Sequence, residues 1–478
     1  MRMAKRKLII VYAGLVGLPL LGLIGILRGG QHLAAPAAAG GTSHLQSSGA
    51  AMPNLVILVV QIAVIIAASS AVAIVFQKMK QPKVIGEMFA GIMLGPSLLG
   101  WVAPHASAAL FPASSLGYLN GLSQVGVVIY MFLVGLALNP KKLHEHGHTA
   151  VLTSHVSIVA PFMLGAALAL FLYPRLSDNS VSFTDFALFM GAAMSITAFP
   201  VLARILSQRN MLGTKLGSLA IACAAVDDVT GWCILAYIVL VVRTHQEAAT
   251  PLWLTLGGLG VFLVLMLSLV KRLLARFEGA FKKRGQLSEN MLTIMILAVL
   301  LSAVTTERLG LHLLFGSFLA GAIMPKDKTF VRYILDRFES TTVVLLLPLY
   351  FAFTGLRTSI QLIRGPGMWT ICAAIILLAI VGKLGGSMLA ARCSGSNWGE
   401  SAALGVLMNT RGLMELVILN IGLDIGVISP ALFSMMVLMA LVTTFMTAPL
   451  FEWVYPTRLI LAETAVSSKD KAVVYELA

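Results

Sequence analysis

Long apolar runs dominate the chain, and each is about as long as a lipid bilayer is thick. A transmembrane helix needs roughly 20 mainly apolar residues. Fourteen segments of the 478-residue chain meet this description. They lie at about 8–27, 54–77, 83–100, 116–138, 149–173, 183–206, 215–242, 252–274, 289–306, 310–325, 341–360, 368–391, 398–423 and 428–453. Because only helices and closed barrels cross a bilayer, runs of this length predict an all-α polytopic membrane protein.

The composition also indicates a surface that faces lipid. Hydrophobic residues make up 58% of the chain and charged residues only 11%, whereas soluble domains carry about 25% charged residues. The net charge of +14 would suit a nucleic-acid-binding protein, but Lys and Arg lie in short stretches between the apolar runs. No nucleophile–base pair or phosphate-binding loop stands out. We therefore expect membrane lipid as the surroundings, and no nucleic acid, cofactor or enzymatic activity.

Basic loops alternate along the chain with loops that are poorer in Lys and Arg. The basic segments include the N-terminal MRMAKRK and the loops at 78–83, 139–148, 204–215, 271–286 and 325–339. The intervening loop at 101–115 has no formal charge. Lys and Arg are enriched in cytoplasmic loops. We therefore expect a multi-pass protein of the bacterial inner (plasma) membrane, with the N-terminus and the C-terminus in the cytoplasm.

The first apolar run has two interpretations. MRMAKRK, an apolar stretch and AAPAAAG together resemble a cleaved signal peptide. The stretch is longer than a usual signal core, which favours a retained helix. The expected organisation is an N-terminal extra helix or signal segment with its loop at 1–53, a transmembrane domain at 54–453, and a short cytoplasmic tail at 454–478.

A weak internal repeat relates the two halves of the chain. GEMFAGIMLGP at 86–96 is similar to FGSFLAGAIMP at 315–325. We expect six spans to begin at each copy, with opposite topology. Inverted repeats are typical of transporters that bind substrate near the bilayer midplane.

Two adjacent carboxylates, Asp227 and Asp228, lie inside the seventh apolar run. A charge at the bilayer centre costs about 2.5–3.5 kcal/mol on insertion scales. Two neighbouring carboxylates also repel each other, so one of them is expected to hold a proton. The alternative is a pair that only joins helices by hydrogen bonds. We favour a site that binds a monovalent cation or protons, because carboxylate oxygens suit both ligands.

The sixth run contains Pro200 in its middle, shortly after Ser195 and Thr197. Proline removes one backbone hydrogen bond and clashes with the preceding turn. In lipid, freed backbone groups are tolerated only beside protein or a cavity. A broken helix at this point would present carbonyls and hydroxyls to a cation. A simple proline kink, repaired by the hydroxyls, is an equally good interpretation.

The thirteenth run is interrupted by polar residues around Gly412. Asn409 and Arg411 precede this glycine, and Glu415 follows it. Arg411 and Glu415 are four residues apart, so they share one side of a helix. The cluster predicts a second interrupted helix, and an internal salt bridge that holds two helices together is the alternative for this pair.

Other charges lie within or beside the apolar runs. Lys383 is well inside the twelfth run, where it either snorkels to the interface or pairs with a carboxylate, and Asp227 is the partner that we expect. Glu87 is near a helix end and is interpreted as a solvated or interfacial charge. Arg357 is expected at the outer interface, and the HEHGH motif at 144–148 in a solvated loop.

Taken together, the motifs resemble a known family. The chain is similar to the monovalent cation:proton antiporters of the Kef-type and plant cation/proton-exchanger branch, which belong to the sodium/proton antiporter superfamily. The resemblance covers about 54–453 and rests on QPKVIGEMFAGIMLGPSLLG, SITAFPVLARIL, AAVDDVTGW, FAFTGLRT and NTRGLMELVILNIG. It implies a 13-helix core of two inverted six-helix repeats, two broken helices that cross beside the aspartates, a homodimer, and an elevator-like movement.

The resemblance also implies roles for particular residues. Asp228 matches the principal cation- and proton-binding carboxylate of the family, and Asp227 matches a neighbouring position that is aspartate in many electrogenic exchangers. Lys383 matches the lysine that pairs with this neighbour. Thr197, with Ser195 beside it, matches the unwound part of the first broken helix. The charged pair on the second broken helix corresponds to Arg411 and Glu415.

The expected function is secondary active exchange of a monovalent cation for H+ by alternating access, with no bound metal other than the transported ion. We expect electrogenic Na+/H+ exchange that serves pH homeostasis, with Li+ as a further possible ion. Exchange of K+ for H+ is the alternative within this class. A cation channel or membrane sensor is the alternative from another class, although nothing resembles a selectivity-filter loop.

Overall fold

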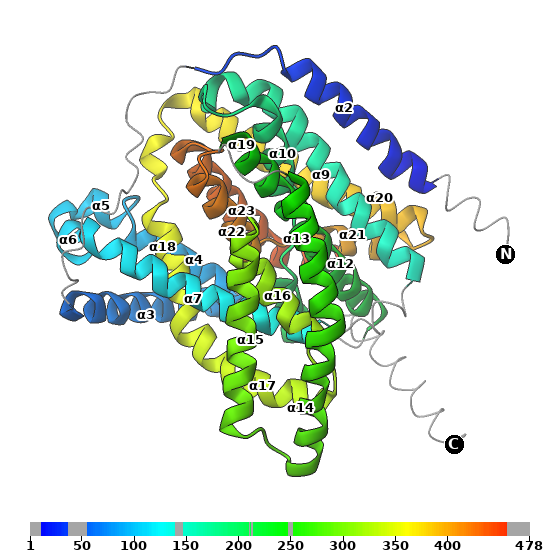
Figure 1. Cartoon of the computed structure of the whole chain (residues 1–478). Coiled ribbons are helices and arrows are strands. Elements are labelled where there is room, and N and C mark those ends of the chain that lie inside the picture. Colours follow the sequence, from blue (N-terminus) through cyan, green and yellow to red (C-terminus); the bar gives the residue numbers. More distant parts are fainter. Residues whose placement is uncertain are drawn as a thin grey trace.

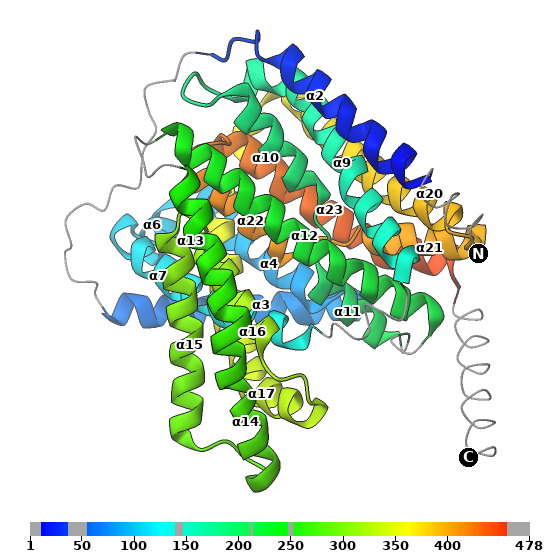
Figure 2. The ribbon, with the colours of Figure 1, turned by 45° about the vertical axis from the view of Figure 1, so that its right-hand side comes forward.

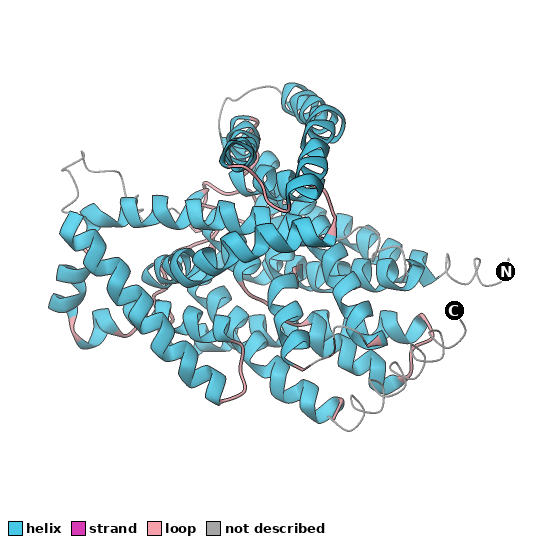
Figure 3. Cartoon of the chain, turned by 90° about the horizontal axis from the view of Figure 1, so that it is seen from below, coloured by secondary structure: helices cyan, strands magenta, loops and turns pink. Residues whose placement is uncertain are grey.

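The computed structural model of the chain describes residues 11–36, 55–138, 147–209, 211, 214–246 and 252–456. Helices are the regular elements throughout these ranges, and no strand occurs within them (Figures 1 and 3). The helices up to Gln246 are η1 (Ala13–Gly17), α2 (Leu18–Gly30), α3 (Leu55–Lys78), α4 (Lys83–Leu94), α5 (Leu99–Val102), α6 (Pro104–Leu110), α7 (Ala113–Ala137), α9 (Gly147–Leu176), α10 (Phe183–Ser195), α11 (Phe199–Gln208) and α12 (Lys215–Gln246).

The remaining described helices lie between Leu252 and Val454. They are α13 (Leu252–Leu265), η2 (Met266–Val270), α14 (Lys271–Arg284), α15 (Glu289–Arg308), α16 (Leu313–Ile323), α17 (Lys328–Thr341), η3 (Thr342–Leu346), α18 (Leu347–Leu356), η4 (Ile360–Leu362), α19 (Gly365–Ile380), η5 (Val381–Gly385), α20 (Gly386–Cys393), α21 (Trp398–Met408), α22 (Leu413–Asp424) and α23 (Pro430–Val454).

The described helices confirm the polytopic membrane architecture. Twelve spans among them are long and apolar enough to cross a bilayer, and the bent pair α21 and α22 gives a thirteenth. The run expected at 310–325 is α16, which has only 11 residues. This helix is short because Gly310 adopts a positive φ of 81° just before it and His312 caps its first turn.

Two segments expected to be loops are helical instead. The segment at 271–286 is mostly α14, which continues the span of α13, and the segment at 325–339 is mostly α17. Their apolar residues recur at helical spacing and pack against each other, with the rings of Phe281 and Phe330 centred 5.6 Å apart. In Figures 1 and 2, α14 and the adjoining end of α15 project beyond the other helices.

The repeat is present, but its expected starting points are wrong. The two similar motifs lie on α4 and α16, which are the second spans of their units and not the first. Counted from α3, six spans end with α12; counted from α15, six spans end with α23. The span of α13 and α14 joins the two units. Each interrupted helix is then the fifth span of its unit, so the two breaks correspond.

Equivalent helices of the two units pack crosswise. α4 packs against α18, and α16 packs against α7. Glycines make the second contact close, since a Cβ on Gly135 would lie 2.1 Å from the carbonyl oxygen of Phe318, and a Cβ on Gly321 would lie 2.0 Å from that of Phe132. Small residues allow helix backbones to approach each other in membranes. This exchange of partners is the packing that an inverted repeat produces.

The N-terminal helix lies at the edge of this arrangement. α2 runs along α9 and also touches α10, as Figures 1 and 2 show. Gly30 at its end packs against Phe183, and its outward face carries exposed Leu18, Leu21 and Ile24. An exposed apolar face of this kind suits contact with lipid.

Candidate ion-binding site

Two interrupted helices meet in the interior of the protein. The first break, Ile196–Ala198, separates α10 from α11, and the second separates α21 from α22, which bend by 44°. Pro200 lies in the first turn of α11, where its missing N–H costs no hydrogen bond. The Ala198 N–H donates to the Thr410 carbonyl over 2.9 Å. This contact joins the two breaks, so the crossing implied by the family resemblance is present.

Cationic side chains cap the end of α10. Arg411 donates to the carbonyls of Ala193 and Met194, and the Lys383 ammonium donates to the carbonyl of Ser195. The last carbonyls of a helix lack partners within the helix and carry its negative dipole end. The carbonyls at the end of α10 therefore accept hydrogen bonds from Arg411 and Lys383. They are not free to bind a cation, which the proline break had led us to expect.

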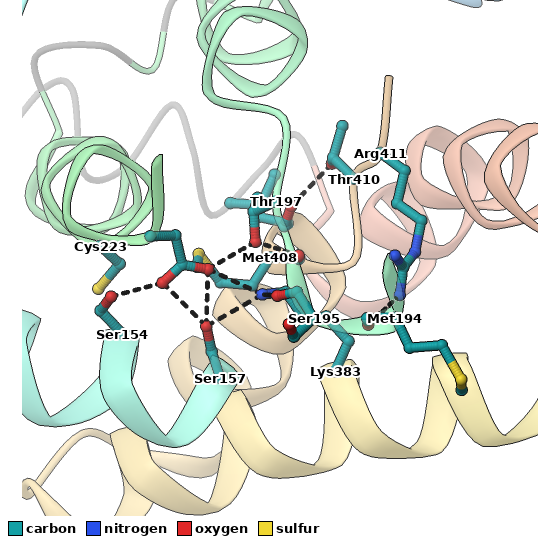
Figure 4. Close-up of polar contacts among 12 residues, drawn as sticks. Ser154, Ser157, Met194, Ser195, Thr197, Cys223, Lys383, Met408, Thr410 and Arg411 are labelled. Carbon is teal, nitrogen blue, oxygen red and sulfur yellow. Dashed lines mark hydrogen bonds and ion pairs between the residues drawn. The ribbon is translucent and has the colours of Figure 1, made fainter. Parts of the chain in front are cut away.

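Asp227 is held by four side chains, two from α9, one from the break after α10 and one from η5; Figure 4 labels these four partners. Ser154 and Ser157 of α9 donate to its carboxylate over 2.5 and 2.8 Å, and Thr197 donates over 2.8 Å. The Lys383 Nζ lies 2.8 Å from Asp227 Oδ2, and both residues are fully buried. The expected Lys383–Asp227 pair is therefore formed, and every oxygen of this carboxylate has a partner.

Asp228 has a different environment. Its side chain is only 1% exposed, and neither carboxylate oxygen has a hydrogen-bond partner among the described residues. The backbone amide of Phe199, the first residue of α11, is close enough to interact with it electrostatically. An unpartnered buried carboxylate is costly unless it binds a proton or a cation. The two neighbouring aspartates thus differ, because Asp227 is charge-compensated and Asp228 has no side-chain partner among the described residues.

The two hydroxyl residues near Pro200 do not contact Asp228 by hydrogen bonds. The Ser195 hydroxyl donates to the Ala192 carbonyl of its own helix over 2.9 Å. The Thr197 hydroxyl lies within hydrogen-bond distance of Asp227 and of the Met408 carbonyl. Both residues therefore support the Asp227–Lys383 pair and the crossing of the breaks in this conformation.

The polar cluster of the second break is also buried. Arg411 and Glu415 form an ion pair of 2.6 Å, so the salt bridge that the sequence left as an alternative is present. Thr444 of α23 bonds to the backbone of Arg411 at both its N–H and its carbonyl. Both polar atoms of the Asn409 side chain lack a hydrogen-bond partner within the described part of the chain.

A cavity of about 730 Å³ lies beside the first break, with Phe199, Pro200 and Val201 in its wall, and neither Asp227 nor Asp228 lines it. Residues of α4, α7, α17, η3 and α18 line one side of it, and residues of α11 and α22 line the other. Its wall includes Phe199, the residue whose backbone interacts with Asp228. Glu87 lines the cavity too and is only 7% exposed. The expectation that Glu87 is a solvated or interfacial charge is wrong, because neighbouring helices cover that turn of α4.

The far ends of the same helices are tied together. Arg357, which follows α18, donates to Asn420 over 3.0 Å and to Asp424 over 2.6 Å, both on α22. The Asn420 amide in turn donates to Tyr350 and Thr354 of α18. Helices α18 and α22 therefore separate around the cavity and close at the end marked by Arg357.

Comparison with known proteins agrees with this architecture. Residues 62–453 match the family described as sodium/hydrogen exchanger, transmembrane. The chain belongs to the sodium/hydrogen exchanger family. The Na(+)/H(+) antiporter NhaS4 of Synechocystis is 45% identical to this exchanger-family chain over 405 residues, which cover 84% of the chain and 98% of NhaS4.

Other relatives of this exchanger-family chain are longer. The Arabidopsis thaliana cation/H(+) antiporter 17 is 37% identical, and the Saccharomyces cerevisiae K(+)/H(+) antiporter 1 is 32% identical, each over 84% of this chain. The chain matches 48% and 47% of their respective lengths. The solved structure of the sodium proton antiporter MjNhaP1 from Methanocaldococcus jannaschii matches with a TM-score of 0.61 at 14% identity, over 86% of this chain and 99% of that one.

Two residues of the site were not predicted from the sequence. Ser154 and Ser157 are three residues apart on α9 and face Asp227 together, but serines in an apolar run carry no distinctive signal on their own. The spacing of three, within an apolar run at 149–173 that contains no Asp, Glu, Lys or Arg, could have suggested a shared polar face. HEHGH at 144–148 lies outside the described residues, apart from the helical backbone at Gly147 and His148.

Proposed function

We propose that the protein is a secondary active antiporter that exchanges a monovalent cation, Na+ in the first place, for protons at Asp228. The observation that carries this proposal is the unpartnered, buried Asp228 carboxylate, at the crossing of two broken helices and near the end of an open cavity. The family of the chain supports it. So does the name of its Synechocystis relative, a Na(+)/H(+) antiporter.

The chemistry of coupling follows from competition for one carboxylate. Lys383 compensates the negative charge of Asp227, whereas that of Asp228 lacks a counter-ion. A buried charge without a partner is strongly unfavourable, so Asp228 crosses the membrane interior only with a proton or a cation bound. Because the two ligands exclude each other, the movement of one in one direction requires movement of the other in return.

Alternating access would arise from movement of one group of helices against another. The cavity between α4, α7 and α18 on one side and α11 and α22 on the other supports a state that is open at one face. The basic loops of the sequence support a cytoplasmic position for this face, and the proposal places both chain termini on the same side. An elevator-like sliding of the group that carries Asp228 would close this cavity and open another near Arg357.

The Asp227–Lys383 pair supports electrogenic exchange. When a cation binds at Asp228, its charge adds to that of the buried ammonium of Lys383, which favours release of a proton from the lysine as well. More than one proton would then move for each monovalent cation. We further propose that the protein acts as a homodimer in a bacterial inner membrane and serves pH homeostasis.

K+ is the second candidate for the transported cation, because one relative is named a K(+)/H(+) antiporter. Transport by purified protein in proteoliposomes with an imposed pH gradient distinguishes the ions when Na+, Li+ and K+ are added separately. We expect Na+ to dissipate the gradient in the wild-type protein and not in Asp228→Asn. Cation flux without proton movement would instead identify a channel, and a rate independent of membrane potential would contradict electrogenic exchange.

A further inference from the structure

The wall of the 730 Å³ cavity contains a second buried carboxylate, and this carboxylate forms no ion pair with a described residue. Glu87 lies in the second turn of α4 and lines the cavity. Only 7% of its surface is exposed. Its Oε2 atom lacks a hydrogen-bond partner among the described residues. Burial of an unpartnered carboxylate is unfavourable in the same way as at Asp228.

The groups that face Glu87 leave it without a direct counter-ion. Arg204 of α11 and Lys83 of its own helix interact with it electrostatically, and neither forms a salt bridge with it in the described structure. Asp336 and Glu339 of α17 line the same cavity and add negative charge. The residues that α18 and α22 contribute to the lining are apolar, as they are at Phe351 and Leu413.

Glu87 and Asp228 are both close enough to Tyr130 to interact with it electrostatically. Tyr130 of α7 lines the cavity and interacts with the charges of both carboxylates, as well as with those of Glu339 and Arg204. A cation that enters between α17 and α11 would meet this negative field before it reaches the end of the cavity. The described lining holds the carboxylates of Glu87, Asp336 and Glu339 against the guanidinium of Arg204, so negative charge is in excess. A cleft with an excess of one sign of charge concentrates the oppositely charged ion.

We propose that Glu87 is a second binding site for the transported monovalent cation, which it holds within the cavity before the ion passes to Asp228. The inference rests on the proposed antiport function and adds an ion-binding residue to it. A carboxylate oxygen and water in the cavity are hard ligands suited to an alkali ion. Because Glu87 lies on α4, across the cavity from α11 and α22, it acts on ions from the cavity side alone.

Because Glu87 is expected to act on ions from the cavity side alone, transport from the two sides can be compared. The apparent KM for ²²Na+ is measured in proteoliposomes of uniform orientation, once from the cavity side and once from the opposite side. Glu87→Gln should raise the cavity-side KM about tenfold, as the loss of about 1.4 kcal/mol of attraction would, and leave the KM from the opposite side unchanged. Vmax/KM should fall by the same factor in both directions, because the substitution cannot change the equilibrium of the exchange. Glu87→Asp should recover part of the loss, and exposed Glu289 on α15 supplies the matched control Glu289→Gln, with wild-type values on both sides.

Equal changes of KM on the two sides, or no change on either, would overturn the second site. Arg204→Gln removes the positive charge that faces Glu87 and should lower the cavity-side KM. A KM that stays constant or rises in that variant contradicts the proposal even if Glu87→Gln does not fold. Failure of the antiport function itself is recognised separately, because wild-type protein would then move no protons in exchange for Na+.

Discussion

The Lys383 ammonium lies 2.8 Å from the Asp227 carboxylate, and both side chains are fully buried. Ser154, Ser157 and Thr197 complete the hydrogen bonds of this carboxylate. The adjacent Asp228 has none among the described residues. One helix thus places a compensated carboxylate beside one without a side-chain partner, and under the proposed function this difference makes Asp228 the one available to a transported ion.

Removal of one partner of the buried pair should destabilise the protein more than removal of both. Lys383→Met leaves the Asp227 charge buried without compensation, which costs about 3–5 kcal/mol. The double variant Asp227→Asn with Lys383→Met keeps the shape and removes both charges, so most of the loss should be recovered. Thermal unfolding of the purified variants in detergent measures the difference. A double variant as unstable as Lys383→Met would show that the two groups are not coupled.

The ties between α18 and α22 should bias the protein toward the conformation with an open cavity. Arg357→Gln removes the ion pair with Asp424, whose side chain is 47% exposed. Such a pair contributes about 0.2–1 kcal/mol, so the balance between conformations should shift about 1.4-fold to fivefold toward the alternative state.

This shift can be read from the cavity itself. In a chain with the four native cysteines replaced by serine, Ala203→Cys places a thiol in the cavity wall. Its reaction with a membrane-impermeant maleimide should slow down when Arg357→Gln is added. Arg364→Gln, an exposed arginine seven residues further on, is the control. An unchanged or faster reaction in the Arg357 variant would argue against this role of the ties.

Lys326 should make the stability of the fold depend on pH. Its ammonium donates to the carbonyls of Gly135, Leu136 and Gly321 over 2.9, 2.9 and 3.0 Å, between the ends of α7 and α16. Burial lowers the pKa of Lys326 from 10.5 to about 7. Between these two values the unfolded chain binds a proton that the folded chain lacks, so stability rises with pH.

Thermal unfolding of wild-type protein and Lys326→Met across this pH window isolates the contribution. The stability of the wild type relative to the variant should increase as the pH rises from about 7 to about 10, and it should level off below pH 7. Lys328→Met, an exposed lysine at the start of α17, is the matched control and should show no such trend relative to the wild type. A constant difference between wild type and Lys326→Met would mean that Lys326 keeps its ordinary pKa when folded.

Much of the fold and the identity of the central charges could be read from the sequence, for physical reasons. A charge such as Lys383 or Asp227 inside an apolar run is costly in lipid, so its presence alone indicates a buried partner. The partners on α9 could not be predicted in this way, because Ser154 and Ser157 are cheap to bury and become significant only through tertiary packing. The position of a residue along its helix also does not show which other helices cover that residue. For this reason the expectation that Glu87 is a solvated or interfacial charge is wrong.

Under the proposed function, Na+ and H+ compete for the Asp228 carboxylate. The apparent KM for Na+ in proteoliposomes, measured over a series of pH values, tests it most directly. This KM should fall as the pH rises, by about tenfold per pH unit for each proton displaced while the site is mostly protonated. Asp228→Asn should show no Na+-dependent proton movement at any pH. A KM for Na+ that does not depend on pH, or wild-type exchange in Asp228→Asn, would contradict it.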